Sequence, residues 1–541
     1  MSAAPPQCSF WRASSTGKAI ADAVHGVPAH FGLVEASRGR RAGSGSAGSN
    51  RLVVVSNRVA RQNEVRAGGL AAAMRAALME NGGLWFGWSG NLVAEDRRQL
   101  HHESDGAIDY ALLDLTQEEY QAYYLGFSNR SLWPLLHFQP TRMQYSHAEY
   151  AGYRRVNQLF AQKLASLLRP ADRIWVQDYH LIPLASELRA LGIRARMGFF
   201  LHVPLPPPQL LADLPCHADL MRTLLAYDLV GVQTAANATS LRRYFLDVAG
   251  ASCTGDTVTQ DGRQTRIAPF PISIDTALVA RQAEAAMNRS AFRGLRASVN
   301  GHKLVIGVDR LDYSKGISQR LQAFDRFLAQ HRPWRKKVSL LQVAPISRKE
   351  VPEYHELRLE VERIVGAING HHARPDWLPI RYVNHSFARA TLTGFYRMAR
   401  VALVTPLRDG MNLVAKEFVA AQDPADPGVL VLSRFAGAAQ ELQQALLVNP
   451  YDPDDLVDAL VQGLEMPLAE RRARWQAMFE CISAHDVGAW RKAFLSALER
   501  CGLPHQHRVP RTVLSMAEIR LGPAATCAVP SCAVANEETA D

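Results

Sequence analysis

Residues 303–316 read KLVIGVDRLDYSKG, and this stretch holds the pattern that decides the fold. The apolar run KLVIGVD is followed by a charged loop, and a segment of helical periodicity comes after the loop. A strand that is buried on both faces of a parallel sheet gives such a continuous apolar run, whereas a half-buried strand alternates. The stretch therefore predicts one strand–loop–helix unit of a parallel sheet.

The same unit recurs on both sides of this stretch. Toward the C-terminus the apolar runs are KVSLLQVAP (337–345), IRYVN (380–384), VALVTP (401–406), VLVLS (429–433) and ALLVNP (445–450). Toward the N-terminus they are LVVVS (52–56), RIWVQ (173–177), RMGFFLH (196–202) and LVGVQ (229–233), with a hairpin around the Asp-Gly turn of TVTQDGRQTRIAPF (257–270). Strands that alternate with helices at this spacing predict an α/β fold with parallel sheets.

The two series of strands meet near residues 270–280, which predicts two Rossmann-like domains facing a central cleft. The extension before the first strand ends in AGSGSAGSN, and a segment so rich in Ala, Ser and Gly cannot bury a core. The predicted organisation is a disordered extension at 1–50, an N-terminal domain at 51–275, a C-terminal domain at 276–485, a helix at 486–505 that could cross back to the first domain, and a disordered tail at 506–541.

The composition excludes several classes of protein. Of 541 residues, 48% are hydrophobic and 21% are charged, which is typical of soluble globular chains, and no uncharged apolar run approaches the length of about 18 residues that a membrane span needs. The formal charge of +10 is dispersed along the chain, which favours an anionic small molecule over nucleic acid as the partner. The seven cysteines are scattered without a CxxC pair, so we expect neither a disulfide framework nor a zinc site, and a reducing cytoplasm as the location.

Ligands of open α/β sheets bind beyond the carboxyl ends of the strands, so the residues that follow each strand are the candidate site. QDYHL (177–181) presents Asp178 and His180 after one strand, and FFLHVP (199–204) presents His202 after the next. Alternatively, each histidine could have a structural role alone, as a partner in a hydrogen bond of the fold. A carboxylate and a histidine at consecutive strand ends nevertheless favour binding of sugar hydroxyls.

The loops of the C-terminal half favour an anion beside a polyol. Arg310 and Lys315 lie around one turn, where they could bracket a diphosphate. TPLRDGMNLVAKE (405–417) places Asp409 in a loop and then starts a helix whose free amides can bind a phosphate, while Glu417 could reach ribose hydroxyls.

Two patterns in the N-terminal half could have either a binding role or a structural role. The pair Gly68-Gly69 could let backbone amides approach a phosphate, or could form a simple turn. The aromatic clusters WFGW (85–88) and YYLGFSNRSLWP (123–134) could pack in the core, or could stack on sugars.

These strings, together with GGLWFGWSG, FFLHVPLPPP and APISR, resemble in sequence and order the trehalose-6-phosphate synthases of glycosyltransferase family 20 over about residues 51–500. The resemblance implies a GT-B fold in which the N-terminal domain binds the acceptor and the C-terminal domain binds the nucleotide sugar. It implies transfer of glucose from UDP-glucose to glucose 6-phosphate with retention, which gives α,α-trehalose 6-phosphate and UDP. Neither a metal nor a cofactor is implied.

The resemblance also implies a role for particular residues. The donor site would comprise Gly68, Gly69, Arg310 and Lys315 at the diphosphate, Phe387 at the uracil, and Leu413, Val414, Ala415, Lys416 and Glu417 at phosphate and ribose. The acceptor site would comprise Arg58, Trp88, Tyr124, Trp133, Asp178 and Arg348. The residues at the reacting groups would be Asp178, His202, Arg310, Lys315 and Asp409, of which His202 and Asp409 hold hydroxyls of the donor glucose.

Several alternatives stay open at this stage. A relative such as glucosylglycerol-phosphate synthase would use another donor or acceptor, and a silent subunit would bind sugar phosphates without turnover. A phosphorylase shares the GT-B fold, but no lysine motif for pyridoxal phosphate is evident. The donor base (UDP, GDP or ADP) is also open. We expect no nucleic-acid or membrane partner, and a homo-oligomer, either dimer or tetramer.

Overall fold

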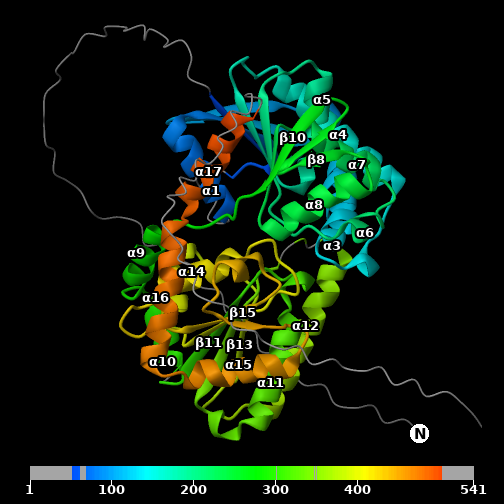
Figure 1. The fold of residues 1–541 in the computed structure, drawn as a ribbon. Helices are drawn as coiled ribbons and strands as arrows, with labels where there is room; N and C mark the ends of the chain where they lie inside the picture. The colour runs from blue at the N-terminus through cyan, green and yellow to red at the C-terminus, as the bar shows by residue number, and fades with distance from the viewer. Residues whose placement is uncertain (1–50, 61–68, 300, 347, 349, 502–541) are drawn as a thin grey trace, which may run out of the picture. The chain divides into compact units, whose positions relative to one another are not determined.

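The computed structural model describes residues 51–60, 69–299, 301–346, 348 and 350–501. The predicted disordered segments and Gly68 therefore lie outside the described residues. Figure 1 shows the two α/β domains that the remaining residues form.

The N-terminal domain is built on a ten-stranded sheet with the order β3-β4-β2-β1-β5-β6-β7-β10-β9-β8. Its strands are β1 (Leu52–Arg58), β2 (Gly83–Leu92), β3 (Leu100–Asp105), β4 (Ile108–Leu115), β5 (Arg173–Gln177), β6 (Arg196–Phe200), β7 (Leu229–Val232), β8 (Ser252–Thr254), β9 (Thr257–Gln260) and β10 (Arg263–Pro269). Its helices are α1 (Gly69–Asn81), η1 (Glu95–Arg97), α2 (Gln117–Glu119), η2 (Tyr120–Leu132), α3 (Trp133–Leu136), η3 (Pro140–Arg142), α4 (His147–Ala165), η4 (Tyr179–Leu181), α5 (Leu184–Ala190), α6 (Pro208–Leu211), α7 (His217–Arg222), η5 (Thr223–Ala226) and α8 (Ala235–Asp247).

The C-terminal domain is built on a six-stranded sheet with the order β13-β12-β11-β14-β15-β16. Its strands, all parallel, are β11 (Lys303–Val308), β12 (Val338–Val343), β13 (Ile380–Val383), β14 (Val401–Val404), β15 (Val429–Ser433) and β16 (Leu446–Val448). Its helices are α9 (Thr276–Ala286), α10 (Ser290–Val299), η6 (Tyr313–Lys315), α11 (Ile317–Gln330), η7 (Arg332–Trp334), α12 (Pro352–His372), α13 (Arg389–Met398), α14 (Leu413–Ala421), η8 (Gly437–Gln440), α15 (Pro453–Glu465), α16 (Leu468–Ala484) and α17 (Val487–Arg500).

The register of the parallel strands brings their carboxyl ends to one edge of each sheet. In the first sheet Ser56 of β1 pairs with Gln177 of β5, which pairs in turn with Phe200 of β6. In the second sheet β11 lies between β12 and β14. The loops that follow these strands are therefore neighbours in space, although they are far apart in the sequence.

One aromatic cluster lies in the core rather than in a site. Trp85 and Phe86 belong to β2, which pairs with β1 on one side and β4 on the other, and both side chains are buried. The packing alternative for WFGW therefore holds for these two residues. The strand pattern of 83–115 escaped the sequence interpretation, because tryptophans and glycines interrupt its aliphatic run.

The last helix packs on the first sheet. The ring of Phe494 in α17 stacks on Trp175 of β5 at 4.7 Å, and a side chain at Gly198 or Gly231 would clash with it. Figure 1 shows α17 beside α1, and residues of these helices are in contact. The two chain segments that join the domains lie side by side, since the Val487 N–H donates to the Ile274 carbonyl at 3.0 Å.

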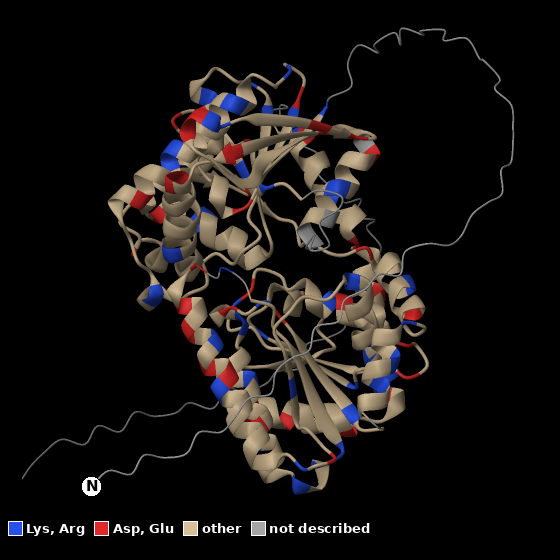
Figure 2. Ribbon diagram, turned by 180° about the vertical axis from the view of Figure 1, so that it is seen from behind, with Lys and Arg blue, Asp and Glu red and all other residues tan. Residues whose placement is uncertain are grey.

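Charged residues of both signs are interspersed over both domains, as Figure 2 shows. Within the described part of the chain, no helix combines the length and the apolarity that crossing a membrane would require.

Candidate functional site

A cavity of about 250 Å³ lies where strand ends of the two domains face one another. Its lining residues come from the end of β1, from the segments after β5 and β6, from η2 and α3, and from the segments after β11, β12 and β14. They are Asn57, Tyr124, Trp133, His137, Asp178, Tyr179, His180, His202, Val203, Arg310, Lys315, Arg348 and Asp409. The structure thus brings together predicted site residues that lie up to 285 positions apart, from Tyr124 to Asp409.

Asp178 is held rigidly at the end of β5. Its backbone has φ 73°, a region that non-glycine residues rarely occupy, and its carboxylate accepts the backbone N–H of His202 at 3.1 Å. Burial raises the pKa of Asp178 to about 6, although the amides of His202 and Tyr179 and the two arginines of the cavity oppose this shift. The carboxylate is therefore mostly ionised at neutral pH and has a fixed direction.

His202 is a neutral histidine. Its Nε2 lies 2.9 Å from the side-chain oxygen of Gln177, which can only accept, so Nε2 carries the proton. Burial lowers the pKa of His202 to about 3. The remaining nitrogen, Nδ1, has a lone pair and suits a hydroxyl donor.

Lys315 and Asp409 form an ion pair across two loops of the C-terminal domain. The Nζ atom lies 2.5 Å from Oδ2, and Asn412 donates to the same oxygen at 3.0 Å. Burial alone would raise the pKa of Asp409, but Lys315, His137 and Asn412 hold it below its usual value. Asp409 is therefore an ionised acceptor in the cavity wall.

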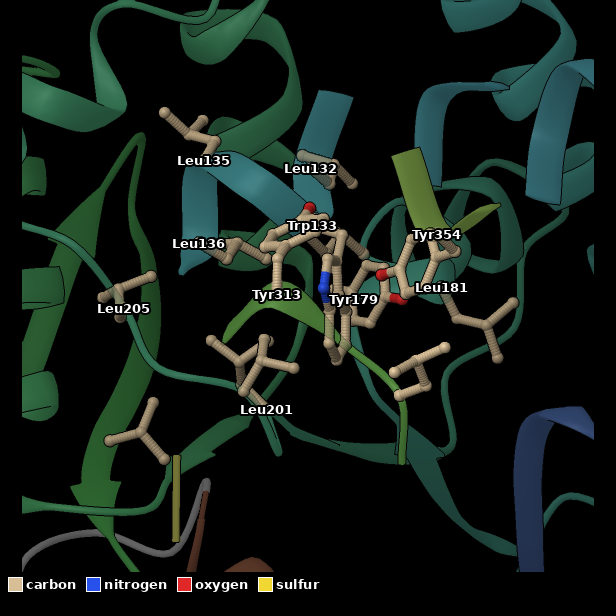
Figure 3. Close-up of a cluster of buried hydrophobic side chains, with 14 of the residues drawn as sticks. Leu132, Trp133, Leu135, Leu136, Tyr179, Leu181, Leu201, Leu205, Tyr313 and Tyr354 are labelled. Atoms are coloured by element: carbon tan, nitrogen blue, oxygen red, sulfur yellow. The ribbon is translucent and has the colours of Figure 1, made fainter. Parts of the chain in front are cut away.

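Arg348 and Arg310 both face the same tryptophan of the other domain. The guanidinium of Arg348 lies 3.8 Å from the ring centroid of Trp133, and that of Arg310 lies 5.7 Å from it. Arg348 also donates to the buried carboxylate of Asp312 at 3.1 Å, whereas Arg310 is exposed to solvent. Figure 3 shows Trp133 among Tyr179, Tyr313 and Tyr354, which come from both domains.

Arg310, Lys315 and Arg348 form the cationic wall of the cavity, and the buried carboxylate of Asp312 interacts with all three. Burial would raise its pKa, but Arg348, Arg310 and Lys315 together hold the pKa of Asp312 well below its usual range. Asp312 is paired with Arg348, and Asp409 is paired with Lys315, so these two carboxylates offset two of the three positive charges. The third cation, Arg310, is exposed and suits an anionic ligand.

The other predicted acceptor residues lie around Tyr124. Tyr124 lines the cavity and stacks on His180 at 5.8 Å, while Trp88 lies 6.2 Å from Tyr124 without reaching the cavity. Arg58 is the last residue of β1 and is exposed. Arg58 and Trp88 are outside the cavity lining, and their roles stay predictions.

The predicted nucleotide-binding residues lie outside the cavity lining. Phe387 is partly exposed and packs edge-on against Phe395 at 5.2 Å. Gly69 is the first residue of α1. Glu417 is paired with Arg389 at 2.9 Å, and burial raises its pKa.

The start of α14 has the free amides that the sequence predicts, but the side chain of Lys416 does not extend toward them. Asn412 caps the helix by accepting the N–H of Ala415 at 3.3 Å, which leaves the first-turn amides of Leu413 and Val414 without an intrahelical acceptor. The side chain of Lys416 points into the protein, where it donates to Glu441 at 2.7 Å and to the Ile272 carbonyl at 2.8 Å. Its ammonium is therefore occupied between the domains.

The sequence interpretation missed several residues of the site. Asn57, His137, Tyr179 and Val203 line the cavity but were not predicted, and His180 was weighed only as a strand-end histidine. Asn57 and Val203 directly follow predicted strands, so the strand-end rule could have found them. His137 lies at the end of a short helix, where no strand points to it.

No group of three or more His, Cys, Asp or Glu that could hold a metal ion occurs in the described ranges. Independence from a divalent ion stays a prediction, which activity in the presence of a chelator would test.

Two Rossmann-like domains, one on a mixed sheet with a parallel centre and one on a parallel sheet, share a polar cavity at their strand ends. This arrangement is the GT-B fold of nucleotide-sugar transferases. Residues 48–500 match the model of glycosyltransferase family 20, so the chain belongs to this family.

The chain is similar to trehalose-phosphate synthases over most of its length. A trehalose-6-phosphate synthase of Sinorhizobium fredii is 48% identical over 466 residues, which cover 84% of this chain and 100% of that protein. The UDP-forming α,α-trehalose-phosphate synthase of Burkholderia vietnamiensis superimposes with a TM-score of 0.82 at 46% identity, covering 84% of this chain and 97% of that one. The enzyme of the same name from Burkholderia xenovorans, solved in complex with glucose 6-phosphate, gives 0.82 at 45% identity, with coverages of 83% and 100%.

Proposed function

We propose that this protein is a retaining glucosyltransferase that moves glucose from UDP-glucose to glucose 6-phosphate, giving α,α-trehalose 6-phosphate and UDP. The observation that carries the proposal is the single cavity in which Arg310, Lys315 and Asp409 of one domain face Asp178 and Trp133 of the other. Relatives that match over more than four-fifths of the chain are named for this activity, and one is bound to glucose 6-phosphate.

The cationic side of the cavity suits departure of a nucleoside diphosphate. As the glycosidic bond breaks, negative charge grows on the diphosphate, and Arg310, Lys315 and the first amides of α14 would stabilise it. Arg310 has the exposed guanidinium of this set, so its charge is available to an incoming phosphate. The amides add positive potential at a helix start.

The part of the cavity around Arg348, Trp133 and Asp178 suits a sugar phosphate. Arg348 is fixed by Asp312 below it and by Trp133 beside it, so its guanidinium is oriented before any ligand binds. Trp133 and Tyr124 offer ring faces to a hexose, and Asp178 offers an oriented carboxylate to a hydroxyl. A preoriented site loses less entropy on binding.

Retention would follow from attack on the face from which UDP departs. In the proposed reaction an oxygen of the donor phosphate takes the proton of the acceptor hydroxyl, and Asp178 orients the acceptor without attacking carbon.

The proposal also includes assembly into a homo-oligomer and a location in the cytoplasm. The four described cysteines, Cys216, Cys253, Cys481 and Cys501, are free thiols, which is compatible with a reducing compartment.

A matrix of donors and acceptors tests this assignment. The purified protein is incubated with UDP-, GDP- or ADP-glucose and with glucose 6-phosphate or glycerol phosphate, and nucleotide release is followed. We expect the highest kcat/KM for UDP-glucose with glucose 6-phosphate. Preference for glycerol phosphate would identify the alternative synthase, and binding of UDP-glucose with no release in any pair would identify a silent subunit.

Gly410→Ala should reduce kcat/KM by about a hundredfold, because displacement of reacting groups by about 1 Å has an effect of that size. A Cβ atom at Gly410 would lie 2.1 Å from the His202 carbonyl oxygen and 2.9 Å from the carbonyl carbon of Val203. The loop that carries Asp409 and Gly410 would have to move away from the backbone of His202 and Val203.

Gly294→Ala is the matched control, since a Cβ atom there meets nothing within 4 Å. Its activity should equal that of the wild type. Full activity of the Gly410 variant would show that the close approach of these two loops is not required for turnover.

A further inference from the structure

His137 lies in the cavity wall with one nitrogen fixed and the other free. It follows α3 and is only 2% exposed, and its Nδ1 lies 2.8 Å from the Trp133 carbonyl oxygen. A carbonyl can only accept, so Nδ1 carries the proton and Nε2 carries a lone pair. Among the residues that the structure describes, Nε2 has no hydrogen-bond partner.

The imidazole is neutral under working conditions. Burial lowers the pKa of His137 to about 4, although Asp312 opposes this shift. The ring of Trp133 packs against it at 4.0 Å, and His137 is one of the residues that line the cavity. A neutral, fixed acceptor of this kind suits a hydroxyl group, and not a phosphate, which has no proton to donate when fully ionised.

The charges nearest to His137 come from the C-terminal domain. Asp312, Lys315 and Asp409 all influence its pKa, and the last two line the same cavity. Asp409 and His137 thus present two acceptors, one ionised and one neutral, from opposite domains. Two acceptors close together match neighbouring hydroxyls of a hexose rather than a single donor group.

A stack of side chains holds these two residues in place. The guanidinium of Arg408 lies between the rings of Phe138 and Phe435, 4.3 Å and 4.4 Å from their centroids. Phe138 follows His137 and has φ 62°, a left-handed conformation that is strained for a bulky residue, and Arg408 precedes Asp409. The stack therefore joins the residues next to His137 and Asp409 across the two domains.

We propose that His137 is a further binding residue for the transferred sugar: its Nε2 accepts a hydrogen bond from one hydroxyl of the donor glucose, opposite Asp409. Arg408 is a positioning residue, because its stack between Phe138 and Phe435 sets the distance between the two acceptors. This inference rests on the proposed function and adds to it one protein residue that contacts the donor sugar.

Deoxy analogues of UDP-glucose test the inference, with one hydroxyl removed at position 2, 3, 4 or 6 of the sugar. For the wild type, loss of the hydroxyl that His137 binds should reduce kcat/KM about tenfold, the effect of one hydrogen bond to a buried group. For His137→Leu the same removal should cost less than about twofold, because variant and analogue delete the same bond and their effects are not additive. His137→Gln, which keeps an acceptor, should restore part of the discrimination.

His372→Gln is the matched control. His372 is equally buried and binds Asp325 at 2.7 Å, but it does not line the cavity, so this variant should discriminate among the analogues as the wild type does. Arg408→Leu should weaken discrimination at the same hydroxyl as His137→Leu and at no other, which a general loss of stability would not do. Thermal unfolding of each variant reports whether it folds.

Additive effects of His137→Leu at all four donor positions would overturn the inference. Coupling that appears only with deoxy analogues of the acceptor would also overturn it. The wild-type reaction keeps the two failures apart: if the wild type releases no UDP from UDP-glucose, the proposed function fails, whereas normal wild-type turnover with additive variants refutes only the role of His137.

Discussion

Arg320→Met is expected to lower the free energy of unfolding by about 3–5 kcal/mol, the usual effect of removing one partner of a buried ion pair. Arg320 is completely buried in α11, and its guanidinium donates to Asp309 at 2.7 Å, Gln342 at 3.0 Å and Thr405 at 3.0 Å. These partners lie at the ends of β11, β12 and β14, the strands whose loops carry the cationic wall. The substitution would leave the carboxylate of Asp309 buried without its main cation.

The loss of unfolding free energy in Arg320→Met should depend on pH in a defined direction. Burial already raises the pKa of Asp309 against the opposing charges of Arg320 and Lys315, and loss of Arg320 would raise it further. A carboxyl whose pKa is raised by folding destabilises the folded state above that pKa, and the penalty disappears below the unfolded value of about 3.9. The difference between variant and wild type should therefore be largest at neutral pH and should shrink as pH falls.

Urea unfolding of both proteins at several pH values measures this difference. Arg326→Met is the control on the same helix: its ion pair with Asp454 is 2.5 Å long, but both side chains are largely exposed, so the expected loss is at most about 1 kcal/mol. Equal losses for the two variants would contradict the anchoring role of Arg320.

Arg310→Ala and Arg348→Ala should give different kinetic defects. Arg310 should act mainly on turnover, because its charge is needed most as UDP departs, and kcat should fall about ten- to a hundredfold. Arg348 should act mainly on the acceptor, so the KM for glucose 6-phosphate should rise far more than that for UDP-glucose. A loss in kcat indicates stabilisation of the transition state, and a loss in KM alone indicates uniform binding.

The structure adds a difference in stability between these variants. Arg348 neutralises the buried Asp312 and packs on Trp133 at 3.8 Å, whereas Arg310 is exposed. Arg348→Ala should therefore also lower the melting temperature, and by more than Arg310→Ala does, since Arg310 acts on Asp312 less strongly. Arg348→Lys keeps a charge for Asp312 without the planar guanidinium, so it separates the stability effect from the binding effect. Identical kinetics for both alanine variants would refute the assignment of the two arginines.

The strand-end rule explains why much of the cavity was predictable. The apolar runs at 173–177 and 303–309 correspond to β5 and β11 with bounds that differ by at most one residue, because strands buried on both faces tolerate few polar residues. Once the strands were located, Asp178, Arg310 and Asp409 followed as the residues just beyond them. Parallel topology then brings such residues to one edge.

Other features needed the three-dimensional structure. Arg320 lies within the helical pattern of α11, where an arginine is ordinarily exposed, and only the fold shows that it faces three strand ends. His137 follows a π-helical segment, η2, and the short α3, neither of which has a periodic signature in the sequence. The side chain of Lys416 was predicted with its helix start, but a helix start places only its amides, and the lysine itself extends toward Ile272.

The most direct test of the proposed function is analysis of the product formed from UDP-glucose and glucose 6-phosphate. We predict that UDP release depends strictly on glucose 6-phosphate, and that the product is a non-reducing disaccharide phosphate. Treatment with a phosphatase should convert it to a disaccharide whose two anomeric protons are equivalent in the NMR spectrum, each with the small coupling of an α-glucoside. A reducing disaccharide, a β-linked product, or UDP release that is independent of glucose 6-phosphate would contradict the proposal.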